Sequence, residues 1–171
     1  MPDSFAFKSI SRNCISDAIS KAERYRLLGE PDEAESVCLD ILQADPGNQE
    51  ALVDLILAVS DQFRSERNPR LELAHSYVAQ LTDEYQRIYY TGVVLEREAG
   101  AYLQRGTPPV LAFLRYCEAM DQFEKAEAIR PPGNASAILR WNACLRAIRR
   151  KQLKPGLGPE EYVPASEPSG S

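Results

Sequence analysis

The chain has 171 residues, which is long enough for one domain with a substantial core. Its formal net charge of −5 argues against a protein built as a whole to bind nucleic acid. The sequence has no apolar run of membrane-spanning length and no apolar stretch of the kind that marks a secretory signal, so we expect a cytoplasmic protein without a membrane partner.

Apolar residues recur three and four positions apart along most of the chain, which is typical of amphipathic helices. The first predicted helix begins near Ile15 and ends at Gly29. A second begins at Pro31 and stops at Pro46-Gly47, and Asn48 then caps a third. Three helices are therefore predicted in the first third of the chain.

The rest of the chain predicts four more helices, separated by proline, glycine and polar residues. A break at Thr82-Asp83 divides the fourth helix from the fifth, although one long bent helix over this region is an alternative. The punctuating residues are Asn68-Pro69 before the fourth helix, Gly106 after the fifth, Pro108-Pro109 before the sixth, Pro131 after it, and Asn134 before a seventh that runs to about Lys154. The expected organisation is a helical domain over 1–154 and a Pro/Gly/Ser-rich tail over 155–171.

Two stretches carry parts of one pattern of small, aromatic and proline residues, and the second has its small, large, small and proline positions in full. In the first, Ala22 and Tyr25 precede a turn at Gly29, and Ala34 and Pro46 follow. The second stretch contains Ala119, Phe123, Ala126 and Pro131, followed by Trp141, Cys144, Leu145 and Ile148. This pattern resembles the tetratricopeptide repeat, in which two antiparallel helices occupy about 34 residues. Cys38 and Ile41 stand where the family has an aromatic and a small residue.

The resemblance covers about residues 15–150 and implies an all-α fold, a short right-handed α-solenoid of about three helix hairpins with a C-terminal basic capping helix. In the family, the first helices of successive pairs line a concave groove that binds peptides. Tyr89 and Tyr90 lie beside the apolar stripe of the fifth helix. They are candidates for rigid anchors in such a groove, or simply for core residues.

The sequence contains few residue patterns of the kind found in catalytic sites. Glu72 and His75 have the spacing of half a carboxylate-bridged metal site, but no second Glu-x-x-His exists to complete it. The sequence contains no phosphate-binding loop, zinc-protease motif or nucleophile elbow. The four cysteines, Cys14, Cys38, Cys117 and Cys144, are far apart and predict buried free thiols in place of a disulfide framework or zinc site. We therefore predict a protein that is not an enzyme and has no catalytic, metal-binding or cofactor-binding residues.

Charge is distributed unevenly along the chain. The segment 134–155 has no acidic residue and contains the basic residues Arg140, Arg146, Arg149, Arg150, Lys151 and Lys154. With the apolar stripe of this helix facing inward, Asn142, Arg146, Arg149 and Arg150 form an adjoining strip that is a candidate partner-binding surface. A capping helix with a solvated outer face explains the same pattern. In the tail, Glu160 and Glu161 could compete with an acidic partner for this strip.

These features favour a protein-protein interaction module, an adaptor, scaffold or chaperone-like protein that binds a peptide or helix in its groove, with an acidic partner as one option. Two alternatives remain: a binder of anionic surfaces or nucleic acid through the basic last helix, nucleic acid being the less favoured partner, and a non-catalytic subunit of an enzyme complex. An apolar N-terminal segment with Phe5, Phe7 and Ile10 is expected either to fold onto the first hairpin or to contact a second copy as a homodimer.

Overall fold

The computed structural model describes residues 5–67 and 69–156 of the chain. Within these residues the secondary structure is helical, with seven α-helices after a short 3-10 turn, η2 (Arg12–Cys14). The helices are α1 (Ile15–Leu27), α2 (Pro31–Ala44), α3 (Gln49–Asp61), α4 (Leu71–Val78), α5 (Glu84–Gln104), α6 (Pro109–Ala128) and α7 (Ser136–Arg150). The all-α prediction is therefore confirmed, and none of these helices is both long and apolar enough to cross a membrane.

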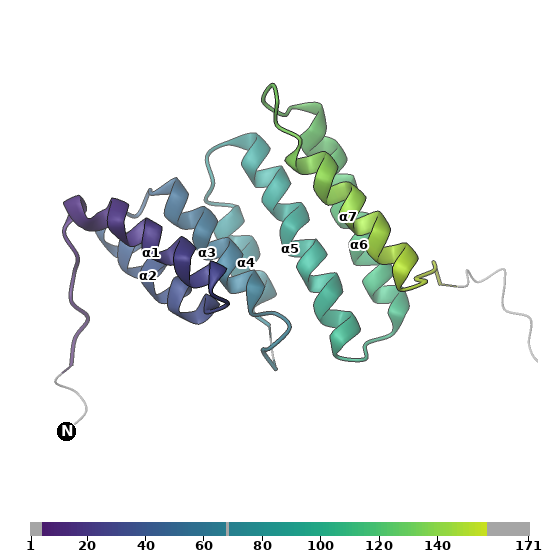
Figure 1. The fold of residues 1–171 in the computed structure, drawn as a ribbon, viewed down its shortest axis with the longest axis horizontal. Helices are drawn as coiled ribbons and strands as arrows, with labels where there is room; N and C mark the ends of the chain where they lie inside the picture. The colour runs from purple at the N-terminus through teal and green to yellow at the C-terminus, as the bar shows by residue number, and fades with distance from the viewer. Residues whose placement is uncertain (1–4, 68, 157–171) are drawn as a thin grey trace, which may run out of the picture.

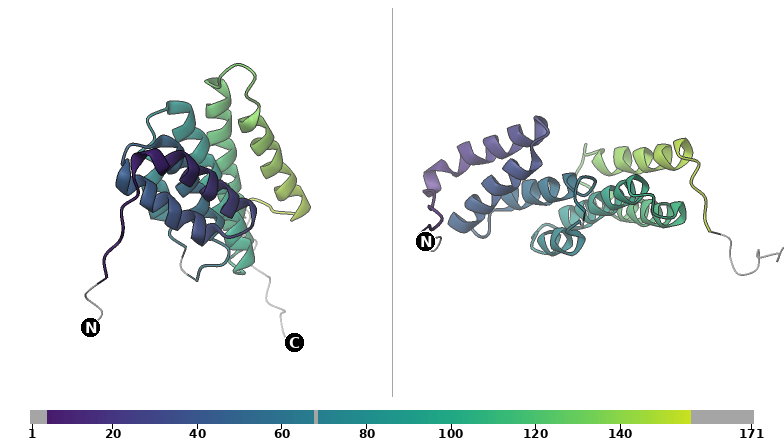
Figure 2. Two further views of the ribbon diagram at one scale, coloured as in Figure 1. Left: turned by 60° about the vertical axis from the view of Figure 1, so that its left-hand side comes forward. Right: turned by 90° about the horizontal axis from the view of Figure 1, so that it is seen from below.

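Consecutive helices pack as antiparallel neighbours, and α5 and α6 form the most extensive pair (Figure 1). Contacts also skip one helix, since α1 packs on α3, α3 on α5 and α5 on α7. In the view from below, α1 and α7 lie at the upper edge of the molecule, whereas α4 lies at the lower edge (Figure 2). The side built by α1, α3, α5 and α7 is called the odd-helix face.

Local signals in the sequence set most helix ends. The side chain of Asn48 accepts a hydrogen bond of 2.9 Å from the N–H of Ala51, and Asp83 accepts one of 2.8 Å from Gln86. The cap at Asp83 confirms the break between the fourth and fifth helices and excludes one long bent helix. Asn68, the expected start of α4, lies outside the described residues.

The seventh helix is shorter than predicted. It ends at Arg150 and not near Lys154, because Gln152 adopts a left-handed conformation with φ 53°. The chain then turns back, so that the N–H of Leu153 donates to the carbonyl of Ile148 at 3.0 Å. The Leu153 side chain, 8% exposed, closes the core at this end of the molecule.

Close contact between α5 and α6 depends on small residues. Ala119 and Ala126 of α6 are fully buried, and Phe123 between them presses its ring against Gly92 of α5. A Cβ added to Gly92 would lie 2.7 Å from Cε1 of Phe123. The small residues singled out by the sequence pattern therefore allow two long helices to approach closely.

The N-terminal segment contacts the first hairpin only in part. Ile10 packs against a small cluster containing Ile19, Ile41 and Ala51. Phe5 and Phe7 are each 91% exposed, so they do not fold onto the hairpin, and their contact with a second copy remains a prediction.

The cysteines are free thiols in the structure, but they are not all buried. Cys38 and Cys144 are buried, Cys117 is half-buried, and Cys14 is exposed. The prediction of four buried thiols is therefore wrong at Cys14, which precedes the first residue of α1 and lies outside its apolar stripe.

Replacing Gly92 with alanine should destabilise the protein by about 1–3 kcal/mol, because the added methyl group overpacks against the buried ring of Phe123. This loss should exceed the gain of about 1 kcal/mol that alanine brings to a helix interior. Urea denaturation followed by circular dichroism measures the change. Gly47→Ala is the control, since no atom lies within 4 Å of its added Cβ. Equal unfolding midpoints for the two variants would contradict the packing described here.

Candidate functional site

Two adjoining hollows lie on the odd-helix face. The first, called the paired hollow, has a volume of about 290 Å³. It is lined by Ser60, Asp61, Arg64, Glu96, Arg97, Tyr116 and Arg140. The second, called the cationic hollow, has a volume of about 430 Å³ and shares Arg64 and Tyr116 with the first. Its other lining residues are Gly100, Leu103, Gln104, Ala147, Arg150 and Lys151.

The carboxylate of Asp61 joins three helices beside the paired hollow. Its Oδ2 accepts a hydrogen bond of 3.0 Å from Nε of Arg26, on α1. Its Oδ1 lies 2.7 Å from Nη1 of Arg97, on α5. The same nitrogen of Arg97 donates to the carbonyl of Leu57 at 2.8 Å and to Oγ of Ser60 at 2.7 Å. One acidic side chain at the end of α3 therefore links α1, α3 and α5.

A second ion pair extends this link to α7. Nη1 of Arg140 lies 3.2 Å from Oε2 of Glu96, the residue before Arg97 on α5. Burial raises the pKa of Glu96, and the charge of Arg140 opposes that rise. Burial lowers the pKa of Arg97, and Asp61 opposes that fall. The cations and carboxylates of the paired hollow therefore largely neutralise one another.

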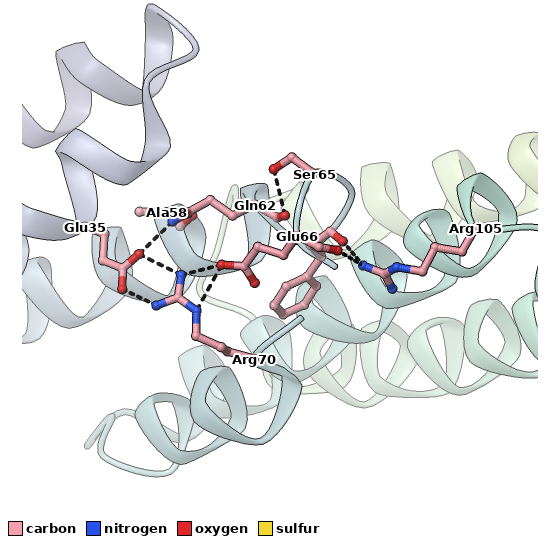
Figure 3. A network of polar contacts seen from close by, with 8 residues as sticks. Glu35, Ala58, Gln62, Ser65, Glu66, Arg70 and Arg105 are labelled. Carbon is pink, nitrogen blue, oxygen red and sulfur yellow. Dashed lines mark hydrogen bonds and ion pairs between the residues drawn. The ribbon is translucent and has the colours of Figure 1, made fainter. Parts of the chain in front are cut away.

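The turn that carries Arg64 is fixed by a polar network between α2 and α5 (Figure 3). Arg70 pairs with Glu35 of α2 and with Glu66 of the turn, and Gln62 donates to Glu35 at 2.7 Å. From α5, Arg105 donates to the carbonyls of Phe63 and Glu66. Since Phe63 is also fully buried, the backbone on both sides of Arg64 is held in place.

The other end of the odd-helix face is acidic. A hollow of about 470 Å³ at α1 and the start of α3 is lined by Glu23, Asp45 and Glu50, with Arg12 as its one cation. The neighbouring Asp54 is 5% exposed, and its Oδ2 has no hydrogen-bond partner among the described residues. The face therefore changes from acidic at its N-terminal end to cationic at its C-terminal end.

The two tyrosines predicted as groove anchors lie in a cluster of rings. The ring of Tyr89 stacks on Tyr85 with centroids 5.7 Å apart and meets Tyr90 edge-on at 5.0 Å. Phe123 lies 5.8 Å from Tyr89 on the other side. Burial raises the pKa of Tyr90 to about 12. Both side chains are half-buried and line neither the paired nor the cationic hollow.

Most of the predicted strip on α7 lies outside the hollows. Of its four residues, only Arg150 lines a hollow, while Arg146 and Arg149 are exposed elsewhere and Asn142 is half-buried. The residues of α7 that line the hollows are Arg140, Ala147 and Arg150, whose spacings of seven and three residues define one face of the helix, and Lys151 follows directly after it. Glu160 and Glu161, the tail residues expected to compete for this strip, lie outside the described residues.

Sequence reasoning missed Arg64, Arg97 and Tyr116. Arg64 lies in a connection that matches the repeat pattern poorly, and nothing in the pattern distinguishes Arg97 from an exposed arginine. Tyr116 falls within the apolar stripe of α6 and reads as a core residue. Its hydroxyl is the available signal, because a buried phenol needs a hydrogen-bond partner and so tends to lie where one can reach it.

The histidine that has the spacing of half a metal site in the sequence lies on α4. His75 is half-buried, and burial lowers its pKa. In residues 5–67 and 69–156, no group of three or more His, Cys, Asp or Glu side chains is placed to hold a metal ion.

Replacing Asp61 with asparagine should destabilise the protein by about 1–3 kcal/mol, because Arg97, whose side chain is only 18% exposed, would lose its carboxylate partner. Chemical denaturation measures the effect. In the double variant Asp61→Asn/Arg97→Gln the loss should be smaller than the sum of the two single losses. Asp17→Asn is the control, since Asp17 is 76% exposed in its ion pair with Lys21. Additive losses would mean that Asp61 and Arg97 are not coupled.

Stability should depend on pH through Asp54. Burial first, and then Glu23 and Glu50, raise its pKa from 3.8 to about 6, while Arg26 opposes the rise. The folded state therefore binds this proton more tightly than the unfolded chain, and the resulting stability is lost as pH rises through about 6. The stability of the wild type relative to Asp54→Asn should fall by about 1–3 kcal/mol from pH 4 to pH 7. A difference that does not vary with pH would show that the pKa of Asp54 is not raised.

Comparison of the chain with protein-family models, with curated proteins and with solved structures found no match, so its role is inferred from the arrangement of its own side chains.

Proposed function

We propose that the chain is a non-catalytic interaction module that binds a peptide or helical segment of another protein on its odd-helix face. The observation that carries this proposal is the pair of adjoining hollows lined from α3, α5, α6 and α7. Together they offer a continuous concave surface with both polar donors and apolar contacts, which suits a segment of chain better than a small compact ligand.

The helix arrangement supports a repeat architecture. The pairs α1/α2, α3/α4 and α5/α6 are antiparallel neighbours, and the first helix of each pair contacts the first helix of the next. Ala22, Ala34 and Ala126, which carry the resemblance to tetratricopeptide repeats, are fully buried. We therefore propose a short solenoid of three hairpins closed by α7, because no single hairpin could bury its apolar stripe alone.

The chemistry of the lining favours binding over catalysis. Arginine guanidinium groups dominate it, and they donate hydrogen bonds without exchanging protons near neutral pH. The two carboxylates, Asp61 and Glu96, are already engaged in ion pairs with Arg97 and Arg140. An adaptor or scaffold role fits such a surface, as does that of a binding subunit in an enzyme complex.

Photo-crosslinking from inside the cationic hollow tests this function. A photoreactive phenylalanine analogue replaces the exposed Gln104, which lines the hollow, in protein returned to a lysate of its source cells. We expect a covalent adduct with a defined partner, identified by mass spectrometry and suppressed by excess wild-type protein.

The matched control places the same analogue at Lys125, an exposed position of α6 that lines neither hollow. The proposal requires that the Gln104 position captures a partner that the Lys125 position does not. Capture of the same proteins from both positions, or of none from Gln104, would refute an interaction surface at the hollows.

A further inference from the structure

The cationic hollow differs from the paired hollow in having no carboxylate in its lining. Its three cations are Arg64, Arg150 and Lys151, and none of them forms an ion pair with a described carboxylate. Cations gathered around a hollow repel one another, and an anion that enters between them relieves this repulsion. Within residues 5–67 and 69–156, the positive charges of this hollow therefore lack carboxylate partners.

Arg64 is seated against the backbone of α5. A Cβ added to Gly100 would lie 2.5 Å from Nη2 of Arg64 and 3.2 Å from its Cζ, so the guanidinium group occupies the space that a side chain would fill. The network around Glu35 and Arg70 holds the turn that carries it (Figure 3). A cation that is already positioned loses less conformational entropy when a ligand binds.

Tyr116 supplies a hydrogen-bond donor at the boundary of the two hollows. It is 6% exposed and lines both hollows. Burial raises its pKa, as do Cys144 and Glu96, while the charges of Arg64 and Arg150 act to lower it. A phenol that shares the lining of one hollow with Arg64 and Arg150 can donate a hydrogen bond to an anion held there.

The charges around the hollow favour a peptide over a nucleic acid. Asp61 and Glu96 lie in the adjoining paired hollow, and Glu23 and Glu50 line the far end of the face. A nucleic-acid strand carries a phosphate at every nucleotide and would bring some of them against these carboxylates. A peptide can be acidic over a few residues and neutral or basic beyond them. Leu103 and Ala147 also offer apolar contacts inside the cationic hollow.

We propose that the cationic hollow binds the carboxylate side chains of an acidic peptide segment, held between Arg64 and Arg150 with the Tyr116 hydroxyl as a third donor. Lys151 adds a fourth donor at the rim. The inference rests on the proposed function and names the chemical class of its partner. The peptide continues across the paired hollow, where Asp61 and Glu96 are already paired with arginines and a neutral sequence fits.

Fluorescence anisotropy with the full-length protein tests this proposal. The probes are a labelled peptide rich in glutamate followed by neutral residues, and the same peptide with glutamine at each glutamate. We expect the glutamate peptide to bind and the glutamine peptide to bind at least about tenfold more weakly. Arg64→Gln and Arg150→Gln should each weaken binding of the glutamate peptide by about tenfold, and Tyr116→Phe by about fivefold.

Two kinds of control locate the effect. Arg146→Gln and Arg149→Gln remove the same charge from exposed positions of α7 outside the hollows, and each should change the affinity less than about twofold at physiological salt. Gly100→Ala retains every charge but displaces the Arg64 guanidinium, so it should weaken binding by a few fold without lowering the unfolding midpoint. Repeating the titration with Glu160, Glu161 and Glu167 changed to glutamine removes any competition from the chain's own tail.

Equal losses from Arg149→Gln and Arg150→Gln would overturn the proposal, because they would indicate attraction to the whole helix. Tighter binding of a single-stranded oligonucleotide than of the glutamate peptide would also overturn it. A third outcome is that neither peptide binds, with or without the tail changes, while crosslinking from Gln104 captures a partner. The partner is then not an acidic peptide, but the proposed interaction module still holds. If crosslinking also captures nothing, the proposed function fails with it.

Discussion

The carboxylate of Asp61 is the interaction on which the geometry of the odd-helix face depends. It holds Arg26 of α1 and Arg97 of α5 at the end of α3, where a helix already presents unpaired carbonyls that attract cations. Such a link matters because the contacts between alternate helices are much less extensive than those within each antiparallel pair. A directional bond fixes the relative positions of helices more strictly than apolar packing, which tolerates sliding. The hollows have a defined shape because these helices cannot shift independently.

The same charges separate the face into regions with different chemistry. Around α1 the carboxylates outnumber the cations, beside α5 the two are matched in pairs, and near the end of α7 cations stand alone. A ligand that lies along the face therefore meets a charge that changes from negative to positive. This change favours one orientation of the ligand along the face as well as a particular set of charges on the ligand. Net charge and total composition cannot reveal this order, because acidic and basic residues distant in sequence are brought together only by folding.

Much of the helical framework was predictable from local sequence signals, and much of the site was not. Asn48, Asp83, Pro31 and Pro109 mark helix starts through backbone chemistry that acts within a few residues, so their roles can be read directly. The hollows depend on which side of α7 faces α5, and a small rotation of that helix separates Arg146 and Arg149 from Arg140 and Arg150. Periodicity locates an apolar stripe only to within one residue on either side. Arg64 depends on a network that joins residues 35 and 70, which no local pattern contains.

The long helix α5 contributes buried residues to both large core clusters: Val94 and Ala101 pack with α1–α4, whereas Val93 and Ala99 pack with α6 and α7. Its neighbouring side chains thus point into separate apolar regions, and no other helix contributes buried residues to both among those described. Coupling between the unfolding of the two regions therefore depends mainly on this one helix. A ligand seated in the hollows would protect amide hydrogens throughout the first four helices from exchange with solvent, although among those helices only the end of α3 lines the hollows. A ligand bound in the hollows would in this way prolong the lifetime of the whole fold.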